Sequence, residues 1–221
     1  MTGEAAVRAD LVEVGRRLYQ KGFIAGNEGN VSVRAGDRLY VTPGGACKGF
    51  LRPEDVVVTD LEGRALAGAR ATSEILMHVA VYRQRPDVGA VVHAHPPTAT
   101  GFAVAGIALD RPVLAEPVVT LGPVPLVPFG TPSTPDLADQ VAAAIVSAHA
   151  LLLANHGALT VGESLFRAWE RMETLEQFAR IALVARLLGG HTELAKDAVL
   201  RLEDLRVSAG YPPPPETPRR G

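Results

Sequence analysis

The stretch Ala90 to Pro97, AVVHAHPP, places two histidines at the end of an apolar run. The run predicts a buried strand over residues 88–95. Alternate residues of a strand face the same side, so the Cβ atoms of His93 and His95 would lie about 6.5 Å apart. Imidazoles at this spacing can bind one metal ion, because Zn–N bonds are about 2.0 to 2.1 Å long. For a single histidine at this place, the usual interpretation is a hydrogen-bonded side chain in the core. For two histidines at strand spacing, a core role and a metal-ligand role are equally well supported.

A third histidine, His156, follows the buried run in LLLANHGALT at 151–160 and precedes a glycine that lets the chain turn. Strand ends of α/β sheets often gather functional sites. Three histidines with one open position are typical of a catalytic zinc site rather than a structural one. The remaining histidines receive no chemical role. His78 lies within a predicted helix, and His149 and His191 lie near helix ends, where a surface or capping role is usual.

Glu74 is the candidate acid/base. It follows Thr72 and Ser73 at the start of a predicted helix, where a carboxylate ordinarily does no more than meet the helix dipole. Hydroxyl groups and free backbone N–H groups at a helix start also form an anion site. The glycine-rich turns at 26–30 and 42–45 would let backbone amides approach a phosphate, although each is equally well a hairpin turn. Neither turn matches a nucleotide-binding fingerprint, so ATP and NAD are not expected.

The composition limits the partners. The chain has 221 residues, of which 47% are hydrophobic, enough for one sizeable core, so a single domain over residues 1–221 is expected. The net charge of -2 and the scattered basic residues predict no nucleic-acid partner and no anionic membrane partner. No secretory signal or membrane span is evident, so a cytoplasmic location is expected. Cys47, the single cysteine, forms no internal disulfide and is interpreted as a bystander.

The lysines argue against Schiff-base chemistry. Only Lys21, Lys48 and Lys196 occur, and none lies in an apolar stretch of the kind that lowers the pKa of an amine. Activation of a carbonyl group is therefore expected to come from a metal.

The order of apolar and turn signals predicts the architecture. Helices are expected at 4–19, from 73 to before Pro86, at 96–105, at 135–148 and at 162–188, and strands at 31–34, 38–42, 56–59, 88–95, 124–129 and 151–154. Two strand meanders without a repeated strand-helix-strand unit favour a central, mostly antiparallel sheet with helices on its faces. The proline-rich tail at 211–221 cannot be helical.

Five motifs together resemble the class II aldolase/adducin family, and within it the zinc-dependent L-fuculose-1-phosphate aldolases. They are GNVSVR at 29–34, TPGG at 42–45, TSE at 72–74, the H-x-H pair at 93 and 95, and NHG at 155–157. The resemblance extends from the first helix to about Gly189, with the motifs in the family's order and at similar spacing. It implies a three-layer α/β/α fold and a homotetramer with active sites at subunit interfaces.

The resemblance also implies a set of site residues. One Zn²⁺ per subunit would be held by His93, His95 and His156, with Glu74 as the acid/base and, before substrate arrives, a further metal ligand. The positions that match those holding the substrate phosphate are Asn30, Gly44, Gly45, Thr72 and Ser73. Tyr211 would act catalytically in the site of a neighbouring subunit. Glu116 departs from the family pattern, which presents a tyrosine near the site at this position.

The implied reaction is the reversible cleavage of a ketose 1-phosphate, similar to L-fuculose 1-phosphate, into dihydroxyacetone phosphate and a small aldehyde. Other reactions of the family remain alternatives: an aldolase for 5-deoxyribulose or methylthioribulose 1-phosphate, a sugar-phosphate 4-epimerase, or a decarboxylase. A non-catalytic adducin-like interaction module is a further alternative, although such a module has no reason to keep three metal-binding histidines together with Glu74.

Overall fold

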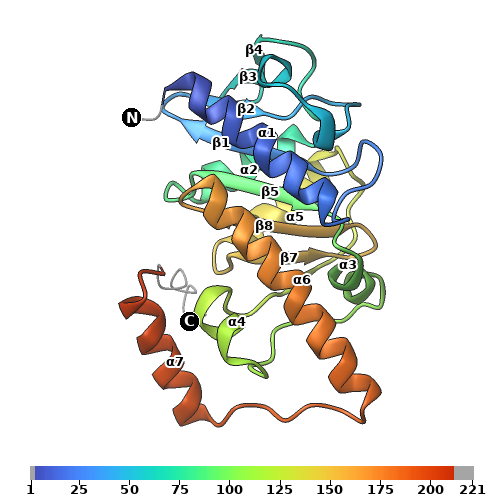
Figure 1. Ribbon diagram of the computed structural model, residues 1–221, viewed down its shortest axis with the longest axis vertical. Helices are drawn as coiled ribbons and strands as arrows, with labels where there is room; N and C mark the ends of the chain where they lie inside the picture. The colour runs from blue at the N-terminus through green and yellow to red at the C-terminus, as the bar shows by residue number, and fades with distance from the viewer. Residues whose placement is uncertain (1–2, 212–221) are drawn as a thin grey trace.

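A computed structural model of the chain describes residues 3–211 and has one sheet at its centre (Figure 1). Within these residues the strands follow the order β4-β3-β2-β1-β5-β8-β7-β6. Their bounds are β1 Asn30–Ala35, β2 Arg38–Val41, β3 Val57–Asp60, β4 Ala65–Ala67, β5 Ala90–Ala94, β6 Leu126–Val127, β7 Ala150–Leu153 and β8 Gly157–Gly162. Neighbouring strands pair antiparallel, except for β6 and β7, which are parallel. The predicted mostly antiparallel sheet is confirmed.

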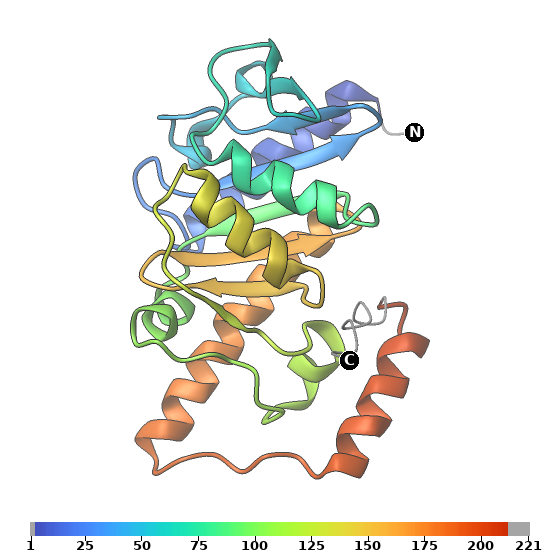
Figure 2. The ribbon, with the colours of Figure 1, turned by 180° about the vertical axis from the view of Figure 1, so that it is seen from behind.

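Helices cover both faces of this sheet, as the three-layer prediction requires. One face carries α1, α3 and α6, and Figure 2 shows α2 and α5 side by side on the other. Helix α7 packs against α4 beyond the edge of the sheet. The helix bounds are α1 Glu4–Gln20, α2 Ile75–Gln84, α3 Pro97–Val104, α4 Ala115–Thr120, α5 Pro135–Ile145, α6 Leu165–Leu187 and α7 Lys196–Ser208, with 3₁₀ turns at Lys48–Phe50 and Pro53–Asp55.

Strand β5 is the strand that positions the site. All of its residues are buried, because β1 and β8 flank it and helices cover both of its faces. This burial explains why the run from Ala90 to Ala94 is apolar apart from His93. In the ladder, His93 lies opposite Asn30 of β1 and Leu159 of β8. The imidazole of His93 is therefore held by the middle of the sheet, and His95 follows one residue after the strand ends.

The expected long helix begins later than predicted. Residues Gly157–Gly162 form the fully buried strand β8, and α6 starts at Leu165. Ser164 caps this helix, since its side chain accepts a hydrogen bond from the Arg167 backbone N–H. Strands β7 and β8 form a hairpin, and Asn155 in its turn adopts a left-handed conformation with φ 55°.

Other elements also differ from the sequence prediction. Helices α4 and α7 and strand β4 were not predicted. Helix α7 buries only Arg206, so its sequence lacks the apolar stripe by which an amphipathic helix is recognised. Helix α2 begins at Ile75, later than the predicted start at residue 73, and Glu74 occupies its N-cap position without a side-chain capping bond. No helix between residues 3 and 211 is long and apolar enough to cross a membrane. Of the predicted tail at 211–221, only Tyr211 belongs to the described residues.

Candidate active site

Three imidazoles converge at one end of the central strands. His93 comes from β5, His95 from the residue after it, and His156 from the turn between β7 and β8. Their ring centroids are 5.0, 4.7 and 5.3 Å apart. Within residues 3–211, this is the one group of at least three histidine, cysteine or acidic residues found to offer ligand atoms within 4.8 Å of one another. The structure thus brings together the three histidines singled out in the sequence.

A glycine makes this convergence possible. A Cβ atom on Gly157 would lie 2.4 Å from Cδ2 of His95 and 2.7 Å from the carbonyl oxygen of Ala94. Any side chain here would push the His95 ring away from its position, so the NHG turn needs its glycine after His156.

The carboxylate of Glu74 lies against the three imidazoles, with one oxygen near His93 and the other near His156. Its Oε2 lies 3.2 Å from Nε2 of His93, and its Oε1 lies 3.3 Å from Nε2 of His156. The Nε2 atoms of His93 and His95 are also 3.3 Å apart. In a tetrahedral zinc site with bonds of about 2.05 Å, neighbouring ligand atoms are about 3.3 Å apart. The spacing and the donor set of three imidazole nitrogens and a carboxylate therefore fit a divalent cation such as zinc.

Contacts outside the cluster orient two of these rings. Nδ1 of His93 lies 2.9 Å from the carbonyl oxygen of Ala158, so it must carry the proton that it donates, and the lone pair of Nε2 faces the cluster. Nδ1 of His95 lies 3.2 Å from Oε2 of Glu28, which favours the same tautomer. Glu28 was not assigned a role from the sequence, where its only signal was its position in the glycine-rich turn at 26–30.

A buried chain of hydrogen bonds ends on Glu74. Asn30 donates from Nδ2 to Oε2 of Glu74 at 2.9 Å, and its Oδ1 accepts from Nε2 of His78. Nδ1 of His78 then accepts from the Ser32 hydroxyl at 2.7 Å, and the Tyr82 hydroxyl donates to Ser32 at 2.8 Å. Burial lowers the pKa of His78 to about 3, which keeps this ring neutral. His78, for which the sequence predicted no role, therefore helps to fix the Glu74 carboxylate.

The charges within the cluster balance one another. Burial favours a neutral Glu74, but the facing imidazoles, His93 first, outweigh it and hold the pKa of this carboxyl well below its usual range. The Glu74 carboxylate in turn outweighs burial at His93 and raises the pKa of that ring. At His156, burial and the charge of His93 lower the pKa to about 4. His156 is therefore neutral near pH 7, in the form that can bind a metal.

The segments predicted to hold phosphate lie next to Glu74. The backbone N–H of Thr72 donates to the carbonyl of Thr42 at 3.2 Å, which joins the 42–45 turn to the start of α2. Gly44, Gly45 and Ser73 are exposed, whereas Thr72 is buried and accepts a hydrogen bond from the Glu74 N–H at 3.3 Å. The Asn30 amide is buried, and both of its polar atoms are hydrogen-bonded, one to Glu74 and the other to His78. Its observed contacts are therefore with the acid/base Glu74 and with His78.

Lys48 contradicts the sequence expectation for lysines. Its side chain is buried, and burial lowers its pKa. Its Nζ donates to the carbonyl oxygen of Asn27 at 2.5 Å, in the turn that carries Glu28. The local sequence is not apolar, and the burial arises because the backbone of Lys48 packs tightly against Gly15 of α1. Lys48 therefore anchors the glycine-rich turn beside the histidines.

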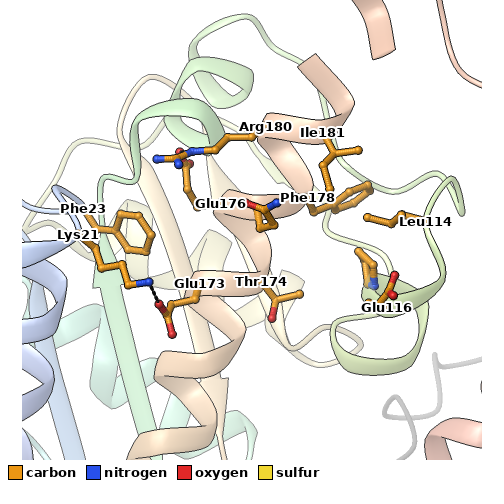
Figure 3. Close-up of a pocket in the computed structure, with 12 residues that line it drawn as sticks. Lys21, Phe23, Leu114, Glu116, Glu173, Thr174, Glu176, Phe178, Arg180 and Ile181 are labelled. Carbon is orange, nitrogen blue, oxygen red and sulfur yellow. Dashed lines mark hydrogen bonds and ion pairs between the residues drawn. The ribbon is translucent and has the colours of Figure 1, made fainter. Parts of the chain in front are cut away.

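Tyr211 and Glu116, two residues considered in the sequence analysis, do not lie at the histidine cluster of this chain. The Tyr211 ring stacks on the Arg167 guanidinium, 4.4 Å from its centroid, near Gly162 at the end of β8 that is remote from the histidines. Its predicted role in a neighbouring subunit stays a prediction. Glu116 belongs to α4 and lines a cavity of about 710 Å³ along α6, beside Thr174 (Figure 3). His149, expected at the surface or in a cap, is instead buried just before β7.

Comparison with known proteins places this geometry in context. Residues 9–183 match the family described as Class II Aldolase and Adducin N-terminal domain. The chain is 34% identical over 177 residues to the 3-oxo-tetronate 4-phosphate decarboxylase of Haemophilus influenzae, covering 77% of this chain and 84% of that protein. It is 32% identical over 175 residues to the L-fuculose phosphate aldolase of Methanococcus maripaludis, covering 78% of this chain and 93% of that protein.

A solved structure has the same fold. YgbL from Klebsiella pneumoniae, for which an aldolase, epimerase or decarboxylase activity is suggested, superposes with a TM-score of 0.85 at 32% identity. The match covers 91% of this chain and all of that one, 100%. The family match over residues 9–183 includes the whole sheet and the segments that carry the three histidines.

Proposed function

The chain belongs to the class II aldolase and adducin family, and we propose that it cleaves a carbon–carbon bond in a phosphorylated sugar with one Zn²⁺ bound per subunit. Its matched relatives are lyase-type enzymes, and so is this chain. The observation that carries the proposal is the cluster of His93, His95, His156 and the Glu74 carboxylate. Three contacts within it measure 3.2 to 3.3 Å: each Glu74 oxygen to one imidazole nitrogen, and His93 Nε2 to His95 Nε2. This spacing favours a single divalent cation.

The first candidate reaction is aldol cleavage of a ketose 1-phosphate similar to L-fuculose 1-phosphate. Breaking the C3–C4 bond leaves its electron pair on C3 as an enediolate, while C4 loses its hydroxyl proton and becomes the aldehyde carbon. His93, His95 and His156 would hold a divalent cation, and this cation would supply the Lewis acidity that polarises the carbonyl group. The Glu74 carboxylate is ionised at rest, so it first takes up the proton that the C4 hydroxyl releases, and in its acid form it then gives this proton to C3, which yields dihydroxyacetone phosphate.

The surroundings of Glu74 suit this role. The Asn30 amide and the backbone of α2 fix the carboxylate, so its free oxygen keeps one direction relative to the substrate. The phosphate group is proposed to bind the neighbouring segments, through Asn30, Gly44, Gly45, Thr72 and Ser73. Exposed glycine backbone in the 42–45 turn and the exposed Ser73 hydroxyl support this assignment.

The aldehyde half of the reaction is proposed to involve a second subunit. Tyr211 lies at the far end of β8 from His156 of its own chain, so it can reach a histidine cluster only in a neighbouring copy. In a homotetramer with active sites at subunit interfaces, its phenol would move a proton at the aldehyde oxygen. This assembly and this role rest on the family resemblance.

Decarboxylation of a 3-oxo sugar acid 4-phosphate is the second candidate. Relatives with this activity are 34% identical to the chain, and Glu116 stands where the aldolases are expected to have a tyrosine. Loss of CO₂ also leaves an enediolate, and it needs no proton transfer at an aldehyde oxygen. The same histidines and Glu74 would serve both reactions. Aldolases for 5-deoxyribulose or methylthioribulose 1-phosphate and a 4-epimerase are further alternatives.

Product analysis tests these proposals. The zinc-loaded protein is incubated with L-fuculose 1-phosphate, methylthioribulose 1-phosphate and 3-oxo-tetronate 4-phosphate, with and without a chelator. Dihydroxyacetone phosphate from the first substrate supports the first candidate, and CO₂ from the third supports the second. Turnover is expected to stop with chelator and to return with Zn²⁺. Turnover that persists after complete removal of metal would contradict the proposed role of zinc.

A further inference from the structure

A cavity that includes several charged side chains lies at the opposite end of the central strands from the histidine cluster. It has a volume of about 360 Å³, within the range of small-molecule sites. It opens where β8 ends at Gly162 and just before β5 begins. We call it the arginine pocket, after the residues that line it, which include Arg85, Asp87, His149, Glu163, Arg171 and Tyr211.

Two buried side chains in this pocket have unused hydrogen-bonding atoms. Arg171 is only 1% exposed, and while its Nη1 donates to the carbonyl of Val161 at 2.6 Å, its Nη2 has no partner. His149 is 2% exposed, and neither of its ring nitrogens has a partner. Buried polar groups are nearly always paired. Because both residues line one cavity, a molecule bound in that cavity would supply the partners.

The charged side chains around the cavity indicate the sign of the charge on that molecule. Asp87 pairs with Arg85 through two hydrogen bonds of 2.8 and 2.7 Å, so both of these groups are occupied. The half-exposed Glu163 carboxylate stays 3.7 Å from Nη1 of Arg171, too far for a hydrogen bond. Arg171 is therefore a buried cation whose described contacts include no hydrogen-bonded carboxylate, a situation that buried charges normally avoid.

The electrostatic environment of His149 agrees with this. Burial first, and then the guanidinium groups of Arg171, Arg206 and Arg85, lower the pKa of His149 to about 3. The ring is therefore neutral near pH 7 and offers one N–H donor. Burial also lowers the pKa of Arg171, to about 10, which leaves it charged. The pocket thus presents donors within a positive field.

We propose that the arginine pocket binds a small oxyanion, a phosphate or a carboxylate group, through Nη2 of Arg171 and the ring N–H of His149. The planar guanidinium and the imidazole together match the oxygens of such a group. The site is separate from the histidine cluster, because β5 and β8 run between the two, and it goes beyond the proposed lyase reaction.

The test is calorimetric titration of the full-length protein with inorganic phosphate in a buffer without other oxyanions. The Ser73→Asp background removes phosphate binding at the candidate active site by placing a carboxylate there. One phosphate per subunit should still bind in this background. Adding Arg171→Met should weaken this binding at least about tenfold, because it removes the charged partner. Adding His149→Phe should weaken it as well.

Two further variants change exposed side chains, so they test the proposal without a substitution in the core. The first should change phosphate binding, and the second is the control. Glu163→Gln removes the competing carboxylate at the rim and should tighten phosphate binding by roughly threefold. Arg111→Met removes an exposed, remote positive charge and should leave the binding unchanged. Acetate that displaces phosphate identifies a carboxylate-type site, and acetate that fails to do so identifies a phosphate-type site. No phosphate binding in the Ser73→Asp background, or binding that ignores both Arg171→Met and Glu163→Gln, overturns the proposal.

Discussion

The two ends of strands β5 and β8 bury histidines in opposite ways. At one end, His93 and His156 face the carboxylate of Glu74, and their Nε2 atoms point toward one centre. At the other end, His149 is surrounded by guanidinium groups, and its nitrogens have no partner. The first arrangement suits a cation and the second suits an anion. The ligand that a buried histidine can serve is thus decided by the charges around it.

The largest difference between the ends should concern zinc. His93→Ala removes a central ligand atom, so zinc affinity should fall more than 100-fold and turnover about 1,000-fold. His149→Ala, a matched change of a buried histidine, should leave the zinc content unaltered. Metal analysis after dialysis and a chelator competition measure both. Equal zinc contents in the two variants would break the comparison.

The next effect separates binding from chemistry at the histidine end. Glu74→Gln should lower turnover by about 10² to 10⁴, because the amide cannot transfer the proton, while zinc content stays nearly constant on three imidazoles. Glu163→Gln, at the arginine end, should leave turnover near that of the wild type. Steady-state rates paired with metal analysis give the readout. Unaltered turnover in the Glu74 variant would remove this residue from the mechanism.

A smaller effect is expected from the contact outside the cluster. Glu28→Ala should weaken zinc binding by about 10- to 100-fold, because His95 loses the acceptor that fixes its ring. Glu28→Gln keeps an oxygen that can accept the Nδ1 proton, so it should recover part of the affinity. The exposed Glu62→Ala serves as control. Zinc competition curves that coincide for Glu28→Ala and Glu62→Ala would rule out this role.

The smallest effect concerns pH and the arginine end. The folded-state pKa of His149, about 3, lies below its ordinary value of 6.5, so only the unfolded chain takes up a proton just below pH 6.5. The contribution of His149 to stability is therefore complete above pH 6.5 and declines as the pH falls toward 3. Between pH 6.5 and 5.5 the loss should be about 1 kcal/mol.

Denaturant unfolding of metal-free protein at the two pH values measures this loss. The His149→Gln variant cannot titrate at this position, so its free energy of unfolding should fall by about 1 kcal/mol less than that of the wild type. Other buried histidines, including His78, titrate in both proteins and cancel in the difference. An identical pH dependence for the two proteins would show that the pKa of His149 is the same in the folded and unfolded chains.

The histidine end was largely predictable from the sequence, and the arginine end was not. His93, His95 and His156 each lie at the end of an apolar run, and the resemblance of the H-x-H and NHG motifs to the family implied that they share one metal site. The antiparallel sheet followed from the spacing of turns. Strand β8, Gly157–Gly162, was not predicted because only two residues separate it from α6, and no clear turn signal marks the boundary between strand and helix.

The residues missed in the sequence acquire their roles through tertiary burial. His78 lies on α2, and only the packing of this helix against the face of β1 that carries Asn30 and Ser32 brings these side chains to it. Lys48 follows a polar turn and is buried by packing against α1. Arg171 belongs to the long helix and reaches the end of β8 only when the layers assemble. No local pattern encodes such long-range neighbours.

The backbone segments that carry the three imidazoles differ in their stability against local opening. This difference determines the order in which the ligands would release a bound metal ion. His93 belongs to β5, whose ladder opens only when the sheet itself comes apart, whereas His156 occupies a hairpin turn beside the left-handed Asn155. Turns fluctuate open at a lower free energy than central strands. Release of a bound ion should therefore start with detachment of His156, while His93 retains the ion until last.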